Sequence, residues 1–231
     1  MKTADAPMPK TGIRLLDPES GEPRQTFGEE LANSISHGVA FLAAAIAGPF
    51  LIVHAARAGR AADAVGASIF VAAIAFLYLG STLYHALPHG AGKRAFRMIE
   101  HMAIFILIAG TYTPFTLGVL RGDWGWTLFG LIWGLAAIGL ALKTLGPARF
   151  PAASLTLYLL MGWVVVFAVG PLWHRMAHRG FWWLAFGGLA YTGGVAFYTA
   201  DHRLRYGHLI WHLFVIAGTL CHFAAVYWYA F

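Results

Sequence analysis

The segment Gly207–Phe223, GHLIWHLFVIAGTLCHF, is apolar enough to cross a bilayer, yet it contains three histidines. His208 and His212 are four residues apart, so in a helix they lie one turn apart on the same face. Ionisable groups inside a membrane are costly and mark functional sites by default. The segment therefore indicates both a membrane-spanning helix and a pair of imidazoles near its start.

The rest of the chain has the same apolar character. Hydrophobic residues make up 59% of the 231 residues and charged residues only 11%, whereas soluble domains are about half apolar and a quarter charged. Seven apolar blocks approach the roughly 20 residues that a membrane helix needs: 33–56, 64–86, 97–120, 125–143, 152–172, 179–200 and 207–230. The sequence predicts an all-α membrane protein, a seven-transmembrane helix bundle over residues 28–231. Residues 1–27 are expected to form a disordered cytoplasmic tail without a cleaved signal peptide.

The distribution of basic residues predicts the orientation of this bundle. Positively charged loops stay in the cytoplasm, and eleven of the 16 Lys and Arg residues fall on the side of the N-terminus: Lys2, Lys10, Arg14, Arg24, Lys93, Arg94, Arg97, Lys143, Arg149, Arg203 and Arg205. We therefore expect the N-terminus inside and the C-terminus outside. The net charge of +6 is explained by this bias, so no nucleic-acid partner is expected. The single cysteine, Cys221, excludes an intrachain disulfide and a Cys-based zinc site.

With this orientation, polar residues from four helices fall at a similar depth near the cytoplasmic face. The candidates outside the last helix come from the first three helices: Glu30, Asn33, His37, Ser81, His85 and Glu100. His101 is expected to face away from Glu100, towards the membrane interface. Two histidines at i and i+4 can share one zinc ion, and His85 would supply a third neutral ligand. Three protein ligands leave the fourth position open for water, as in catalytic zinc sites. Glu100 is the carboxylate best placed to act as base, and Ser81 could bind the water or a substrate carbonyl.

Other interpretations remain open at this point. His208 and His212 can be hydrated residues at the membrane interface, and Glu30, Asn33 and His37 can form a polar cap with helix-packing contacts instead of supporting a metal site. His208 and His222 also lie 14 residues apart on one face, which would suit haem ligands. No partner helix carries a similar pair. His222 has no assigned role.

The motifs around these residues resemble those of a known family. ELANSISH (30–37) fits E-x-x-N-x-x-x-H, STLYH (81–85) fits S-x-x-x-H, and HLIWH (208–212) fits H-x-x-x-H. Together with LIAGTYTPF (107–115), they resemble the hemolysin III branch of the progestin and adipoQ receptor (PAQR) family, over about residues 28–231. This family includes the adiponectin receptors and is related to alkaline ceramidases.

The resemblance implies seven helices and a zinc ion on the cytoplasmic side of a bacterial plasma membrane. The zinc ligands of the family correspond to His85, His208 and His212, and its serine to Ser81. Its acidic residue is usually aspartate, where this chain has Glu100. The expected function is a hydrolase-like protein that acts on amide or ester bonds of membrane lipids and serves membrane homeostasis. The alternative is a non-enzymatic, pore-forming or membrane-stress protein with structural or sensory zinc. The loops are too short to bind a protein hormone, and the oligomeric state is not predicted.

Overall fold

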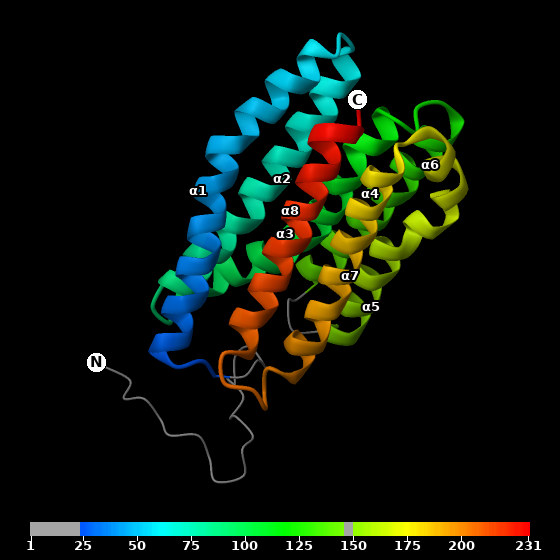
Figure 1. The fold of residues 1–231 in the computed structure, drawn as a ribbon. Coiled ribbons are helices and arrows are strands. Elements are labelled where there is room, and N and C mark those ends of the chain that lie inside the picture. Colours follow the sequence, from blue (N-terminus) through cyan, green and yellow to red (C-terminus); the bar gives the residue numbers. More distant parts are fainter. Residues whose placement is uncertain (1–23, 146–149) are drawn as a thin grey trace.

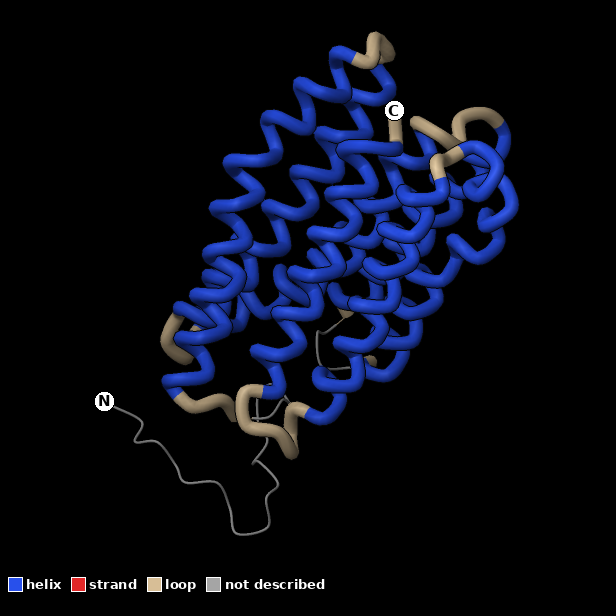
Figure 2. The backbone as a smooth tube through the Cα atoms, viewed as in Figure 1, coloured by secondary structure: helices blue, strands red, loops and turns tan. Residues whose placement is uncertain are grey.

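The computed structural model describes residues 24–145 and 150–231, and this part of the chain contains helices and no strands (Figures 1 and 2). The helices are α1 (Phe27–Arg57), α2 (Ala61–Ala86), α3 (Ala91–Leu117), α4 (Asp123–Thr144), α5 (Pro151–Trp163), a 3₁₀ segment (Val164–Ala168), α6 (Val169–Arg175), α7 (His178–Ala200) and α8 (Gly207–Tyr229). Because α5, the 3₁₀ segment and α6 form one continuous path, the described residues make seven spans. The predicted all-α, seven-helix class is confirmed.

Six of these spans are long and apolar enough to cross a membrane, with Pro151–Arg175 counted as one. The helix α7 has 23 residues, a length that also suffices to cross a bilayer, but it is not among the six. The chain is thus a multi-pass helical membrane protein. The bundle places the start of α1 and the C-terminus at opposite ends (Figure 1).

The first helix begins earlier than the apolar block at 33–56 predicts. Thr26 caps it: its hydroxyl accepts a hydrogen bond from the Glu29 amide, and the Glu29 carboxylate accepts one from the Thr26 amide. Such a capping box satisfies two amide groups that a helix start leaves unpaired. Most of the tail predicted at 1–27 lies outside the described residues. Of its described residues, Thr26 forms the cap and Phe27 is already the first residue of α1.

The fifth span is interrupted where the sequence predicted one regular helix. Tyr112 of α3 donates a hydrogen bond to the carbonyls of Met161 and Gly162, at 2.9 Å each, and accepts one from the Val165 amide at 2.9 Å. The hydroxyl is thus inserted into the backbone ladder of the span, which is a known cause of a local 3₁₀ turn. Periodicity in the sequence does not reveal such an insertion, because it depends on another helix.

The packing is uneven around the bundle. The helices α1, α2, α3 and α4 pack in sequence order, and α8 packs extensively against α7 and also against α1. By contrast, α5 makes few contacts with α3, α4 and α7. This loosely packed side leaves room for a cavity between α3, α5, α7 and α8.

Candidate metal centre

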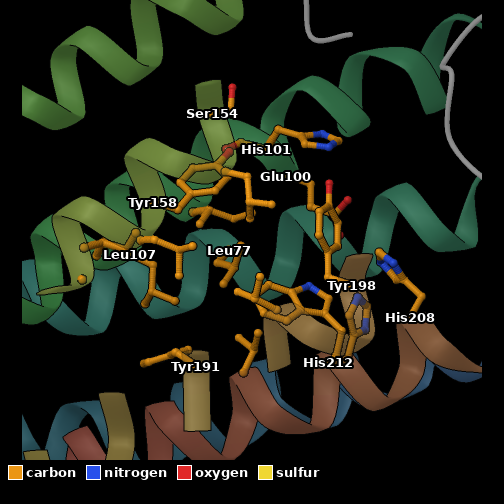
Figure 3. A pocket seen from close by; sticks show the side chains of 18 of the residues that line it. Leu77, Glu100, His101, Leu107, Ser154, Tyr158, Tyr191, Tyr198, His208 and His212 are labelled. Carbon is orange, nitrogen blue, oxygen red and sulfur yellow. The ribbon is translucent and has the colours of Figure 1, made fainter. Parts of the chain in front are cut away.

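Three helices bring four potential metal ligands together at one end of the bundle. His85 lies in the last turn of α2, Glu100 in the third turn of α3, and His208 and His212 in the first two turns of α8. One ligand atom from each of the four lies within 4.8 Å of the others. Figure 3 shows His208 and His212 on one side of the cavity and Glu100 on the other. The residues predicted to meet at this depth are therefore adjacent.

Each imidazole of this cluster has one nitrogen that makes no hydrogen bond to the described residues. The Nε2 atoms of His85, His208 and His212 are buried, and none has a hydrogen bond to any residue within 24–145 or 150–231. The ring centres are 4.7 to 5.1 Å apart. Buried polar atoms are rarely left unpaired, because desolvation without a partner is costly. Three of them beside a carboxylate fit a bound cation, so this donor set is suited to a metal ion.

The other ring nitrogen of each histidine faces an oxygen. Nδ1 of His85 lies 2.7 Å from Glu30 Oε2, and Nδ1 of His212 lies 3.1 Å from Ser36 Oγ. The Ser36 hydroxyl donates its proton to the Asn33 carbonyl at 2.8 Å, so it accepts from His212. The tautomer inferred from these contacts carries the proton on Nδ1 and leaves the lone pair of Nε2 free, as metal-binding histidines require.

The third histidine faces an aspartate from the loop before α8. Nδ1 of His208 lies 3.6 Å from Asp201 Oδ2, and the His208 amide donates to Asp201 Oδ1 at 3.0 Å. The Asp201 carboxylate is buried and also accepts a hydrogen bond from Gln25 at 3.0 Å. Asp201 thus connects the start of α8 to the residues that precede α1.

Glu100 is held by a chain of hydrogen bonds from α1. The Ser81 hydroxyl donates to Glu100 Oε1 at 2.5 Å and accepts from Nδ1 of His37 at 2.7 Å. Glu100 Oε1 also lies 3.5 Å from Nε2 of His85. Both contacts use Oε1, which leaves Oε2 for a proton or a ligand. In this arrangement Ser81 orients the carboxylate, whereas its sequence position suggested a contact with water or substrate.

The residues proposed to support the site occupy three different positions. Glu30 contacts His85 directly, and His37 contacts Ser81 and stacks on His212 with ring centres 3.6 Å apart. Asn33 is buried, accepts the Ser36 hydroxyl through its carbonyl, and donates from its side chain to Gln25 at 2.8 Å. The polar face of α1 therefore forms one wall of the cluster.

Sequence reasoning missed four residues at this site: Gln25, Ser36, Lys93 and Asp201. Ser36 lies three residues after Asn33 on the same face of α1, so helical spacing could have identified it. Lys93 forms an ion pair with Glu30 at 2.9 Å. Gln25 and Asp201 lie in loops, where no periodic pattern relates sequence position to direction.

His222 lies apart from the cluster. It is ten residues after His212 on α8, about 15 Å along the helix axis, and its Nε2 donates to the Leu184 carbonyl at 3.2 Å. His208 faces His85 and His212 instead of forming a pair with His222. The geometry does not support a haem between these two residues.

A large cavity opens onto the cluster. Its volume is about 1260 Å³, and its wall combines the four cluster residues with many apolar side chains of α3, α5, α7 and α8. The apolar part includes Leu77, Leu107, Leu159 and Val195, and it continues as far as His222. Figure 3 shows Leu107 and Tyr191 at a distance from the histidines on the same cavity. The cavity therefore offers a polar end and a long apolar end.

Comparison with known proteins agrees with this architecture. Residues 25–223 match the family described as "Haemolysin-III related". The chain is 40% identical to "Hemolysin-3" of Bacillus cereus over 205 residues, 89% of this chain and 93% of that protein. It is 42% identical to "Hemolysin-3 homolog" of Bacillus subtilis (strain 168) over 204 residues, 88% and 95% of the two chains.

A more distant similarity extends to animals. The human "Monocyte to macrophage differentiation factor" is 28% identical over 227 residues, 93% of this chain and 90% of that protein. The family match covers six spans fully and most of the seventh, and it includes all four cluster residues. The chain belongs to the Haemolysin-III related (PAQR) family of multi-pass helical membrane proteins.

Proposed function

We propose that the protein is a zinc-dependent hydrolase of amide or ester bonds in membrane lipids, with a role in membrane homeostasis. The observation that carries this proposal is the set of three unpaired Nε2 atoms beside Glu100, at the polar end of an apolar cavity. A lipid has a matching shape, because its scissile carbonyl lies between a polar headgroup and a long apolar chain.

A transition metal such as zinc suits the donor set better than Mg²⁺ or Ca²⁺ does. Imidazole nitrogens are preferred by zinc and other transition metals, whereas Mg²⁺ and Ca²⁺ prefer oxygen ligands. His85, His208 and His212 would hold the ion as three neutral ligands, a set that leaves a position open. When bound, zinc supplies a Lewis acid that polarises a carbonyl and activates water.

The residues of the chain would perform the remaining steps. Glu100 would accept a proton through Oε2 and return it to the leaving group, as a general base and then a general acid. Ser81 and His37 would keep the carboxylate in this orientation through Oε1. The apolar wall of α3, α5 and α7 would hold the acyl chain and exclude water from it.

We further propose that the site lies at the cytoplasmic face of a bacterial plasma membrane. The sequence bias in Lys and Arg residues predicts that this end of the bundle faces the cytoplasm. Among the described residues, this end carries Arg24, Lys93, Arg94, Arg97, Lys143, Arg203 and Arg205. Two of the similar proteins come from Bacillus. The partners would be membrane lipids, not nucleic acid or a protein hormone.

The name of the Bacillus cereus relative supports a second candidate function. "Hemolysin-3" suggests membrane lysis, in which zinc would be structural or sensory and no bond would be hydrolysed. This alternative predicts zinc-dependent dye leakage from liposomes without turnover of any lipid.

The decisive experiment is the substitution Glu100→Gln, assayed on ceramides, phospholipids and simple esters with zinc measured in the same sample. The amide keeps the size of the side chain but cannot accept a proton. We expect zinc to remain bound and hydrolysis to fall about 10²- to 10⁴-fold. Asp123→Asn, an exposed carboxylate at the opposite end of the bundle, serves as the control and should retain wild-type turnover.

Two outcomes would contradict the proposal. Wild-type turnover in fully metallated Glu100→Gln would exclude Glu100 as the general base. Dye leakage by wild-type protein that hydrolyses none of the lipids would favour the lytic alternative.

A further inference from the structure

Arg97 on α3 is a buried cation without a counter-ion among the residues that the structure describes. The residue is only 7% exposed, its Nε is buried without a hydrogen bond, and it lines the cavity beside the candidate metal centre. Within the two described stretches of the chain, no hydrogen bond or ion pair reaches its guanidinium. Burial of an unpaired charge is costly, and such charges are normally paired.

The carboxylates of the cavity are all engaged elsewhere. Glu30 binds His85 and Lys93, and Glu100 binds Ser81. Asp201 binds Gln25 and faces His208. These three are the acidic side chains that line the cavity among the described residues, so Arg97 has no anionic partner there. A ligand that enters the cavity can supply one.

The position of Arg97 indicates which part of a ligand it would meet. Arg97 precedes Glu100 by three residues, so both lie on one face of α3, about 4.5 Å apart along the helix axis. Arg97 lies between Glu100 and the N-terminal end of α3, where His89, Gly90 and Arg94 also line the cavity. A lipid whose carbonyl is at the cluster would extend its acyl chain past Leu107 and its headgroup towards Arg97.

We infer that Arg97 binds the phosphate of an anionic lipid headgroup, so that the ligands of this cavity are acidic phospholipids. The inference takes one premise from the proposed function, namely that a lipid occupies the cavity. A guanidinium presents paired N–H donors that match phosphate oxygens in a bidentate contact. A free fatty acid would not satisfy Arg97 in this way, because its carboxylate occupies the position of the scissile carbonyl beside Glu100.

The test compares three short-chain ligands in an uncharged detergent: dioctanoyl phosphatidic acid, dioctanoylglycerol and octanoic acid. Binding is measured by tryptophan fluorescence on zinc-loaded wild type, Arg97→Gln, Arg97→Lys and Arg203→Gln. Arg203 is exposed at the same end of the bundle and does not line the cavity, so it controls for general charge. We expect wild type and Arg203→Gln to bind phosphatidic acid about 10- to 100-fold more tightly than dioctanoylglycerol.

In Arg97→Gln this preference should disappear, while affinity for dioctanoylglycerol persists. Arg97→Lys should keep part of the preference, because it retains the charge but not the bidentate geometry. The inference is wrong if wild type shows no preference, if Arg97→Gln keeps it, or if octanoic acid binding depends on Arg97 to the same extent. If Arg97→Gln does not fold, the preference for phosphatidic acid is compared between wild type and Arg97→Lys. An undiminished preference in Arg97→Lys would then contradict the inference. Binding does not require turnover, so an inactive wild type would contradict the hydrolase proposal and leave this test intact.

Discussion

Each histidine of the candidate metal centre faces an oxygen on its far side. Glu30, Ser36 and Asp201 face the Nδ1 atoms of His85, His212 and His208 respectively. Such contacts fix the tautomer and the ring direction before a metal arrives, and a carboxylate partner raises the basicity of the ligand. The site is therefore preorganised by residues that do not themselves reach the metal position.

The three histidines should be required for zinc binding. Purified wild-type protein should contain about one zinc per chain, as expected for a site of this type. His85→Ala and His212→Ala should each lose it, because two remaining imidazoles are a poor site. His222→Ala should retain zinc, since its Nε2 bonds to Leu184 instead. Elemental analysis measures the content, and full occupancy in His85→Ala would remove α2 from the site.

Asp201→Asn tests the orienting contact to His208. The change keeps the size of the side chain but removes the negative charge that faces Nδ1. Loss of such a contact typically weakens metal affinity about 10- to 100-fold. Competition with a chelator measures this affinity, and Asp123→Asn is the matched control. Equal zinc affinity in the two variants would show that Asp201 serves only to hold the loop before α8.

At the scale of elements, α7 and α8 pack closely through small residues. Gly187 of α7 lies directly against the ring of His222 on α8, which also bonds to Leu184 of α7. A side chain at position 187 would overlap this ring, whereas Gly188 next to it has no atom within 4 Å of where a Cβ would lie. His222 thus contributes to helix packing.

This difference predicts opposite effects from two adjacent substitutions. Gly187→Ala should destabilise the protein by roughly 1–3 kcal/mol through overpacking. Gly188→Ala should be neutral or slightly stabilising, because alanine favours helix and meets open space. Thermal unfolding in detergent compares the two variants. Equal melting temperatures would mean that α7 can shift away from α8 without cost.

Most of the buried ionisable side chains that the structure describes gather at one end of the bundle, and the bias in basic residues predicts that this end faces the cytoplasm. A reporter placed before Met1 should be cytoplasmic, and one placed after Phe231 should be periplasmic or extracellular. A reporter at Gly59, between α1 and α2, should agree with the C-terminal fusion. Location of both termini on one side would contradict the seven spans.

The sequence by itself determined the class of the protein and most of the cluster. Long apolar blocks cannot fold stably in water, so they imply membrane helices, and their number and approximate limits follow from length alone. The i, i+4 spacing placed His208 and His212 on one face, and the alternation of helix direction placed His85 and Glu100 at the same end. The spacing is a local property of a helix, and the alternation follows from successive membrane crossings, so neither requires a specific contact between helices.

Only the tertiary structure decided the contacts between helices and loops. The hydrogen bond from Ser81 to Glu100, the orientation of His208 by Asp201 and the insertion of Tyr112 into the fifth span each join residues whose mutual direction no periodic pattern encodes. The same holds for Arg97. As a sequence position it was one of eleven basic residues that predict topology, but the packed bundle encloses it in a cavity whose carboxylates already have partners. Burial and pairing are properties of the packed bundle, because they depend on what every neighbouring helix places around a side chain.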